Sequence, residues 1–512
     1  MIPGIGGNNL LFSYRAMKSS QSLTNKVKEA GKHALIYGFG SVLQSMIGFV
    51  FIPLYTKYYT PEIYGTFSIL TICGTLAATL FGLGAPSSLS RSYFDYSAEE
   101  ERAKVASTSL AIGAAGFCLL LLTGIFASQQ LSNSLFSTDQ YSIHLLFTMT
   151  SSGIGVLNNV LNVLLRFRRR SVAVISIGVS SLLTQSILIF LLLVHFKLGI
   201  LAPILGGLIG QFLQFTLLTV VAYRYLSPRL LNSELPVQLK FGAQSVLVGL
   251  GMYSLDWINR FLMKSYCSLH DVGVYTLAYQ IGSIINLGMI LPFSFIWAPM
   301  RMEYIKDNDS PVLFRLITSY YFFAGYGIIL LVSLFSHDLL ALIVQRDDFM
   351  ESYKLIPFVM IALLIYGSIN IVDIGVYYAR KQAYVILIFF GTAALNALLA
   401  KLLFPTWGYL SAGLLLVFSN GLMAFAVACM SNRYHRLSFE WKRLAGQTAL
   451  LAIALSTLFF ELPSGKTGLW VKSTAAFGYF FASYVFILSN KEKQKLYGLK
   501  NFFRNADQQT PN

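Results

Sequence analysis

Long apolar segments alternate with short polar ones along almost the whole chain. Each apolar segment holds about 20 residues, the length that an α-helix needs to cross a hydrocarbon core of about 30 Å. The pattern therefore predicts an all-α polytopic membrane protein with about 14 transmembrane helices. The predicted spans are residues 34–54, 64–86, 105–127, 142–165, 172–195, 199–223, 241–262, 273–298, 312–334, 354–378, 383–404, 409–430, 444–461 and 469–488.

The loops between these segments differ in charge. An even number of spans places both termini on one side of the membrane, and 29 of the 38 lysines and arginines then fall on the side of the termini. Because cytoplasmic loops carry an excess of Lys and Arg, both termini are predicted to be cytoplasmic. The net charge of +16 is explained by this topology, so it does not indicate binding to nucleic acid.

A weak internal repeat connects the two halves of the chain. Gly65 in YGTFSIL corresponds to Gly273 in VGVYTLA, Arg91 to Arg301, and Asn158 to Asn370, at separations of 208, 210 and 212 positions. Because each unit holds six helices, an even number, we expect a parallel repeat with two pseudo-symmetric six-helix lobes. The predicted segments are an N-terminal cytoplasmic segment (1–33), an N-lobe (34–223), a cytoplasmic linker (224–240), a C-lobe (241–430), two further helices with their preceding loop (431–488) and a basic cytoplasmic tail (489–512).

Composition excludes several classes of function. Only 12% of the residues are charged, about half the share of a soluble domain. The four cysteines are scattered without a CxxC or Cys/His cluster, which argues against disulfides and metal binding. No P-loop or long outer loop is present, so we expect no cofactor, no ATP hydrolysis and no enzymatic activity.

Charged and polar residues inside the spans are the candidates for chemistry, since each charge at mid-bilayer costs at least about 2.5–3.5 kcal/mol. Asp256, Arg260 and Lys264 are spaced i, i+4, i+8 and share a helix face with Asn259 nearby. This stripe could hold an anionic headgroup. The structural alternative is an Asp256–Arg260 pair with Lys264 reaching toward the membrane surface.

Further candidates lie in other spans. Asn158 in the fourth span and Asn370 in the tenth could line a polar cavity or form interhelical hydrogen bonds, and Asp373 is the candidate for ion coupling. Arg91 and Arg301 close their spans at the cytoplasmic side, where they could meet phosphate or serve as topology anchors. Lys57 lies in the first outer hairpin.

Three motifs resemble a known family, the bacterial polysaccharide transporters that include the O-antigen and capsule repeat-unit flippases. Pro53-Leu-Tyr-Thr-Lys57 with Thr60-Pro-Glu-Ile-Tyr-Gly65 resembles the first hairpin of that family. Gly82-Leu-Gly84 with Arg91-Ser-Tyr-Phe-Asp95 resembles the end of its second helix, and Val272-Gly-Val-Tyr-Thr-Leu-Ala278 matches the entry to its eighth. Where relatives commonly carry Asp-Arg in the seventh helix, this chain has Asn259-Arg260, and Asp256 can supply the acid one turn earlier.

The resemblance places the chain in the multidrug/oligosaccharidyl-lipid/polysaccharide exporter superfamily. It implies a multi-pass protein of the bacterial inner membrane that moves an undecaprenyl-pyrophosphate-linked oligosaccharide between leaflets by alternating access, for O-antigen, capsule or exopolysaccharide synthesis. Its partners would be the lipid-linked oligosaccharide, membrane lipid, and a polysaccharide polymerase with a chain-length regulator. The alternatives are a multidrug/cation antiporter of the same superfamily and a membrane polymerase or glycosyltransferase. An antiporter usually stops at twelve helices, and a polymerase needs the outer loops that this chain lacks.

Overall fold

The computed structural model describes residues 48–305, 310–457 and 466–487, and these residues form α-helices joined by short turns. The contacts divide the chain into two compact units. Unit 1 is built on Leu70–Leu250, and unit 2 combines Phe51–Ile69 with the chain from Gly251 onward. The predicted N-terminal segment, most of the first predicted span and the basic tail lie outside the described residues.

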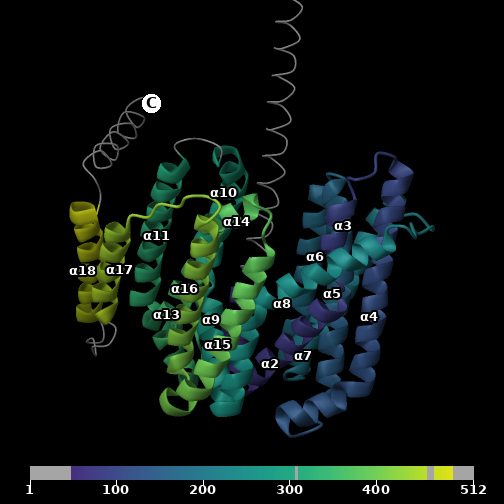
Figure 1. The fold of residues 1–512 in the computed structure, drawn as a ribbon. Coiled ribbons are helices and arrows are strands. Elements are labelled where there is room, and N and C mark those ends of the chain that lie inside the picture. The colour runs from purple at the N-terminus through teal and green to yellow at the C-terminus, as the bar shows by residue number, and fades with distance from the viewer. Residues whose placement is uncertain (1–47, 306–309, 458–465, 488–512) are drawn as a thin grey trace, which may run out of the picture. The chain divides into compact units, whose positions relative to one another are not determined.

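Unit 1 is a group of long helices that pack along their lengths (Figure 1). It contains α3 (Ala85–Ser92), α4 (Glu99–Phe136), α5 (Ser142–Phe167), α6 (Ser171–Phe190) with the π-helix η1 (Leu191–His195), and α7 (Leu201–Ala222) with the 3-10 turn η2 (Tyr223–Tyr225). α5 packs against both α4 and α7, and α6 packs against α7. Leu89, Val105 and Leu161 are among the fully buried side chains of its hydrophobic core.

Unit 2 holds the remaining helices (Figure 1). They are α9 (Leu269–Gly282), η3 (Asn286–Ile290), α10 (Leu291–Tyr304), α11 (Ser310–Leu334), α12 (Ser336–Ile343), η4 (Asp347–Lys354), α13 (Ile356–Val372), α14 (Ile374–Tyr378), α15 (Ala383–Trp407), α16 (Leu410–Asn432), α17 (Trp441–Ser456), α18 (Lys466–Ala482) and η6 (Ser483–Ile487). α13 packs against α16, α11 and α9, and α17 lies between α11 and α18. Two more helices, α2 (Pro61–Phe81) and α8 (Leu235–Tyr266), each run from one unit into the other.

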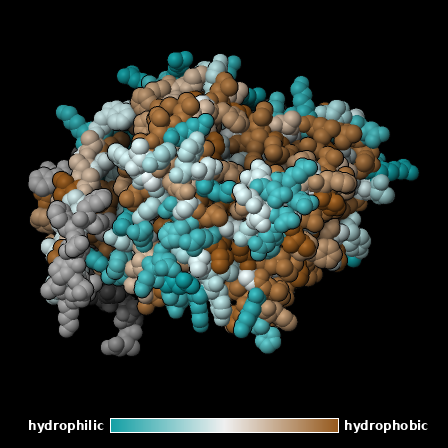
Figure 2. All heavy atoms as spheres, turned by 90° about the horizontal axis from the view of Figure 1, so that it is seen from below, coloured by the Kyte–Doolittle hydropathy of each residue, from teal (hydrophilic) through white to brown (hydrophobic). Residues whose placement is uncertain are grey.

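Eight helices among the described residues are long and apolar enough to cross a membrane, or nine if the bent pair η4–α13 counts as one span. α5 and α8 are also long, with 26 and 32 residues, but polar residues such as Asn158 in α5 and Asp256 and Arg260 in α8 lower their hydropathy. Large hydrophobic side chains are exposed on the candidate membrane-spanning helices, for example Phe126 on α4, Val220 on α7 and Phe425 on α16. Figure 2 shows hydrophobic side chains at the surface over broad areas, with hydrophilic side chains among them.

The predicted fold class, an all-helical polytopic membrane protein, is confirmed, and most helix positions agree with the hydrophobic pattern. The span predicted at 142–165 is α5, and the span predicted at 172–195 is α6 with η1. Two predicted spans are interrupted instead. The helix expected at 64–86 ends at Phe81, because Leu83 and Gly84 adopt a left-handed backbone with φ of 50° and 63°. The helix expected at 354–378 breaks at Asp373 between α13 and α14.

Within unit 2, the start of α2 lies directly against the start of α9. A Cβ atom added to Gly65 would lie closer than 3.0 Å to the Leu269 carbonyl oxygen, and one added to Gly273 would meet the Pro61 carbonyl oxygen equally closely. One turn further along, the Thr276 hydroxyl donates a hydrogen bond of 2.9 Å to Ser68. Gly65 and Gly273 are equivalent positions of the predicted repeat, and so are Ser68 and Thr276. Contacts between equivalent positions are what a two-fold axis passing between α2 and α9 would produce.

Candidate functional site

Arg260 is the most deeply buried charged side chain among the candidates, with 6% of its surface exposed. It lies on α8, in unit 2, where its guanidinium forms an ion pair with Asp256 one turn earlier. The sequence predicts this pairing, since residues four apart on a helix are neighbours. A charge pair removed from water is stable only if both members stay paired, so the two side chains hold each other in place.

Two tyrosines of α9 complete the surroundings of this guanidinium. The centre of the Arg260 guanidinium lies 5.3 Å from the ring centroid of Tyr275 and 4.9 Å from that of Tyr279. These tyrosines are four residues apart, so they share one face of α9. The electron-rich faces of the rings stabilise a cation that has lost most of its hydration. Arg260 therefore keeps its charge within the protein.

Several polar atoms around Arg260 make no hydrogen bond of standard geometry in the described chain. They are Arg260 Nε, both side-chain atoms of Asn259 and the Tyr275 hydroxyl, all of them buried. The Asn259 amide lies near the Tyr275 hydroxyl. Each of these three side chains can donate a hydrogen bond, and buried donors ordinarily find acceptors. Such a convergence of donors beside a guanidinium is suited to the oxygen atoms of an anion.

Arg301, Asn370 and Asp373 form a second polar cluster in unit 2. Arg301 Nη1 lies 2.7 Å from both the Asp373 carboxylate and the Asn370 carbonyl oxygen. Trp297 Nε1 donates to the same carbonyl oxygen at 3.1 Å, and the guanidinium lies over the Tyr377 ring at 4.9 Å. These donors from α10 replace helical hydrogen bonds at the break between α13 and α14. The sequence predicted Arg301 and Asp373 as separate candidates, and the structure brings them together.

The candidates in unit 1 have different partners. The Asn158 amide donates to the backbone oxygen of Gln211 at 3.0 Å and to its side-chain oxygen at 2.7 Å, so it joins α5 to α7. Arg91 on α3 pairs with Asp95, and about half of each side chain is exposed. Arg91 thus differs from its repeat equivalent Arg301, which is mostly buried.

The two lysine candidates of unit 2 lie near the ends of their helices. Lys57 is exposed, with its ammonium 5.8 Å from the ring centroid of Tyr58. Lys264 is half-buried in the last turn of α8. The Arg260 guanidinium contacts Asp256, Tyr275 and Tyr279.

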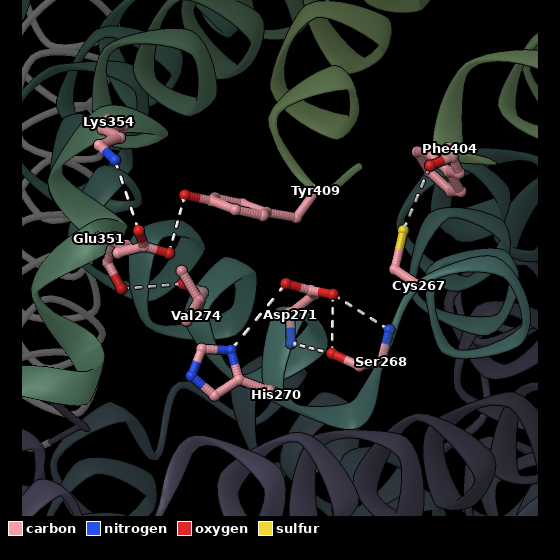
Figure 3. A network of polar contacts seen from close by, with 10 residues as sticks. Cys267, Ser268, His270, Asp271, Val274, Glu351, Lys354, Phe404 and Tyr409 are labelled. Atoms are coloured by element: carbon pink, nitrogen blue, oxygen red, sulfur yellow. Dashed lines mark hydrogen bonds and ion pairs between the residues drawn. The ribbon is translucent and has the colours of Figure 1, made fainter. Parts of the chain in front are cut away.

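A polar network surrounds the start of α9, the helix that carries Tyr275 and Tyr279 (Figure 3). Ser268 and Asp271 form a reciprocal capping box at the start of this helix. The Ser352 hydroxyl donates to the Val274 carbonyl oxygen at 3.0 Å, and Tyr409 donates to Glu351 at 3.0 Å. Burial raises the pKa of the Cys267 thiol to about 11, so this cysteine is protonated at neutral pH and contributes packing rather than reactivity.

Sequence reasoning missed the tyrosines around Arg260. The signal available was the spacing of Tyr275 and Tyr279 on one face of α9, together with the match of Tyr275 to Phe67 in the repeat. Tyr64 on α2, which donates to Gln280 on α9, also lies near Arg260. Tyrosines of membrane proteins often gather at the membrane surfaces, whereas these three tyrosines are buried or nearly buried.

Comparison with known proteins gives a family. A family model described as "Polysaccharide biosynthesis protein" matches residues 30–305, which is more than half of the chain. No curated protein matches the sequence.

Solved structures give the fold. The lipid II flippase MurJ in an inward closed conformation is similar with a TM-score of 0.71 and 15% identity, over 88% of this chain and 99% of MurJ. An inward-facing multidrug resistance MATE family transporter of the MOP superfamily has a TM-score of 0.59 and 14% identity, over 77% of this chain and 97% of that one. A MOP superfamily transporter from Pyrococcus furiosus has a TM-score of 0.58 and 14% identity, over 78% and 95%. The chain therefore has the fold of these multi-pass transporters.

Proposed function

Because this chain belongs to the polysaccharide biosynthesis protein family, whose fold is that of transporters rather than enzymes, we propose that it is a lipid-linked oligosaccharide flippase. Its cargo is an undecaprenyl-pyrophosphate-linked repeat unit, moved from the cytoplasmic to the periplasmic leaflet of a bacterial inner membrane for O-antigen, capsule or exopolysaccharide synthesis. The observation that carries this proposal is the buried Arg260, surrounded by hydrogen-bond donors in a protein of this family.

The physical problem is to carry a pyrophosphate and a polar glycan past hydrocarbon. A guanidinium binds phosphate oxygens through two parallel N–H groups, which a lysine ammonium cannot do. Arg260 offers these paired donors, and the Asn259 amide and the Tyr275 hydroxyl can add further hydrogen bonds. Without cargo, the Arg260 guanidinium forms its ion pair with Asp256. The cargo pyrophosphate takes the place of Asp256, and the prenyl chain remains in lipid.

The remaining candidates extend this assignment. Lys264, Lys57, Asn158, Asn370, Arg91 and Arg301 are proposed to contact the cargo along its path. The proposed topology has 14 transmembrane helices, with two six-helix lobes at 34–223 and 241–430, two C-terminal helices and cytoplasmic termini. The close contacts between Gly65 and Gly273 support the pseudo-symmetry of the lobes. A polysaccharide polymerase and a chain-length regulator are the proposed partners.

A multidrug/cation antiporter is the competing function within this superfamily. A transporter of organic cations needs a carboxylate inside the membrane that is available to the cargo. Among the described residues, Asp256 pairs with Arg260, Asp373 with Arg301 and Asp338 with Lys472. Three carboxylates already neutralised by basic side chains favour an anionic cargo.

Reconstitution of the full chain distinguishes these functions. We expect proteoliposomes that contain the protein to expose a radiolabelled lipid-linked oligosaccharide, extracted from the source bacterium, to a membrane-impermeant oxidant added outside. Nearly the whole pool should react, whereas liposomes without protein should expose only their outer leaflet. Ethidium flux in the same vesicles is the comparison. Ethidium transport without glycolipid transport would favour the antiporter.

Asp373 is proposed as the ion-coupling residue. If Arg301 holds an ionisable Asp373 at the break between α13 and α14, collapsing the proton and sodium gradients should slow wild-type glycolipid transport several-fold. The Asp373→Asn variant should transport slowly and show no further response to the ionophores. Asp338→Asn, which alters the half-exposed Lys472–Asp338 pair, is the control and should keep the response. Wild-type transport that is unaffected by collapse of both gradients would exclude coupling.

A further inference from the structure

Tyr253 lies far from the membrane surfaces, where aromatic residues of membrane proteins usually gather. It lies on α8, 18 residues after Leu235 and 13 before Tyr266, so it is about 27 Å and about 20 Å from the two ends of the helix. Aromatic belts form at the membrane surfaces, near helix ends. Yet 56% of this side chain is exposed. A tyrosine hydroxyl is thus presented in the middle of a membrane helix.

The face of α8 that carries Tyr253 is packed on both sides of it. At about 100° per residue, Gly249 and Arg260 both lie within about 40° of Tyr253 around the helix axis. A Cβ atom on Gly249 would lie 3.2 Å from Thr79, so little space is left at that glycine. Arg260 is buried against Tyr275 and Tyr279. Protein therefore packs against this face of α8 one turn before and two turns after Tyr253, whereas the ring of Tyr253 itself is left open.

The neighbours of Tyr253 are those of a carbohydrate site. Asp256, one turn further along α8, has a quarter of its side chain exposed. Tyr366 on α13 lies within electrostatic reach of both Tyr253 and Tyr279. The Trp257 ring packs beside the Tyr253 ring with 5.7 Å between centroids and holds it in place. An open aromatic face next to a carboxylate and a hydroxyl can pack on the C–H face of a pyranose while accepting hydrogen bonds from its hydroxyls.

We propose that Tyr253 is the platform on which a sugar ring of the cargo stacks, with Asp256 and Tyr366 as its hydrogen-bonding neighbours. The inference rests on the proposed function, and it separates two tasks along α8. Arg260 binds the pyrophosphate, and Tyr253, about two turns away, binds the first part of the glycan. That spacing is about 10 Å along the helix axis, which suits a headgroup whose pyrophosphate is followed directly by a sugar.

The test measures binding of two probes to the purified full chain in detergent. One probe is the lipid-linked oligosaccharide extracted from the source bacterium, and the other is undecaprenyl pyrophosphate, which has no sugar. Tyr253→Leu should weaken binding of the glycan-bearing probe by about tenfold, the effect of one aromatic stacking contact. Binding of undecaprenyl pyrophosphate should change less than about twofold, well below that stacking contact. Tyr253→Phe, which keeps the ring, should retain most of the affinity for the glycan.

Tyr378→Leu is the matched control, because Tyr378 is exposed to a similar degree but lies at the end of α14. It should leave the binding of both probes unchanged. Equal weakening of both probes by Tyr253→Leu, or no weakening of either, would overturn the platform while leaving the flippase assignment intact. Failure of the wild-type protein to bind the glycan-bearing probe would overturn both.

Discussion

Arg260→Ala is expected to lower the rate of glycolipid transport by about a hundredfold at wild-type protein levels. The substitution removes the guanidinium and leaves Asp256 as a carboxylate without its ion-pair partner. Truncating one member of a buried charge pair costs about 2–5 kcal/mol, much of it through the partner left behind. The measurement is the initial rate of oligosaccharide translocation in proteoliposomes, with the reconstituted amount of protein determined in parallel.

Companion variants separate the loss of a binding group from the loss of stability. Arg260→Lys keeps the charge but loses the planar fork, so we expect intermediate transport. The double variant Asp256→Asn with Arg260→Ala also removes the unpaired carboxylate of Asp256. It should recover thermal stability without recovering transport. Arg346→Ala, which disrupts the exposed Arg346–Asp348 pair, is the control and should behave as wild type. Normal transport by Arg260→Ala would remove this arginine from the cargo site.

Gly273→Ala is expected to cause the largest loss of stability. The added Cβ would lie closer than 3.0 Å to the Pro61 carbonyl oxygen, and backbone atoms can yield only if α2 and α9 move apart. Overpacking of this kind typically costs about 1–3 kcal/mol, and more where the obstacle is backbone. We expect a clear fall in the midpoint of thermal unfolding in detergent, together with a lower yield of folded protein.

The control is a second glycine-to-alanine substitution that is expected not to lower the stability of the protein. Gly421, on α16, has no heavy atom within 4 Å of an added Cβ. Alanine is favoured over glycine in a helix by up to about 1 kcal/mol, so Gly421→Ala should leave stability unchanged or raise it. A wild-type unfolding midpoint for Gly273→Ala would mean that the two helices are not held in backbone contact in the membrane protein.

The hydrophobic pattern predicted helices well because lipid-spanning segments have a fixed length and need no partner to be recognised. α5 and α16, for example, begin and end within two residues of the predicted spans. The breaks at Gly84 and Asp373 were not predictable from that pattern, since hydropathy does not report backbone torsions. At Asp373 the break depends on donors from α10, which lies more than 60 residues earlier in the sequence.

At the candidate site, too, contacts within one helix were predictable from the sequence and contacts between helices were not. Asp256 and Arg260 could be paired from the sequence, because four residues of helix separate them. The contacts of Arg260 with Tyr275 and Tyr279 depend on how α9 packs against α8, and the pairing of Arg301 with Asp373 depends on how α10 packs against α13. Such tertiary contacts are not encoded in the period of one helix. The repeat was the one sequence signal that reached across the chain, and its equivalent glycines do meet.

The covalent links between the two units have a mechanical consequence. The chain passes between them at residues 50/51, 69/70 and 250/251, and each of these points lies inside a helix. A loop can absorb a change in geometry freely, whereas a helix resists bending and stores elastic energy. Glycine lowers that resistance, and Gly249 and Gly251 flank the crossing in α8. α8 is therefore expected to bend most easily near Gly251, and Arg260, the proposed cargo-binding cation, lies less than three turns beyond that point.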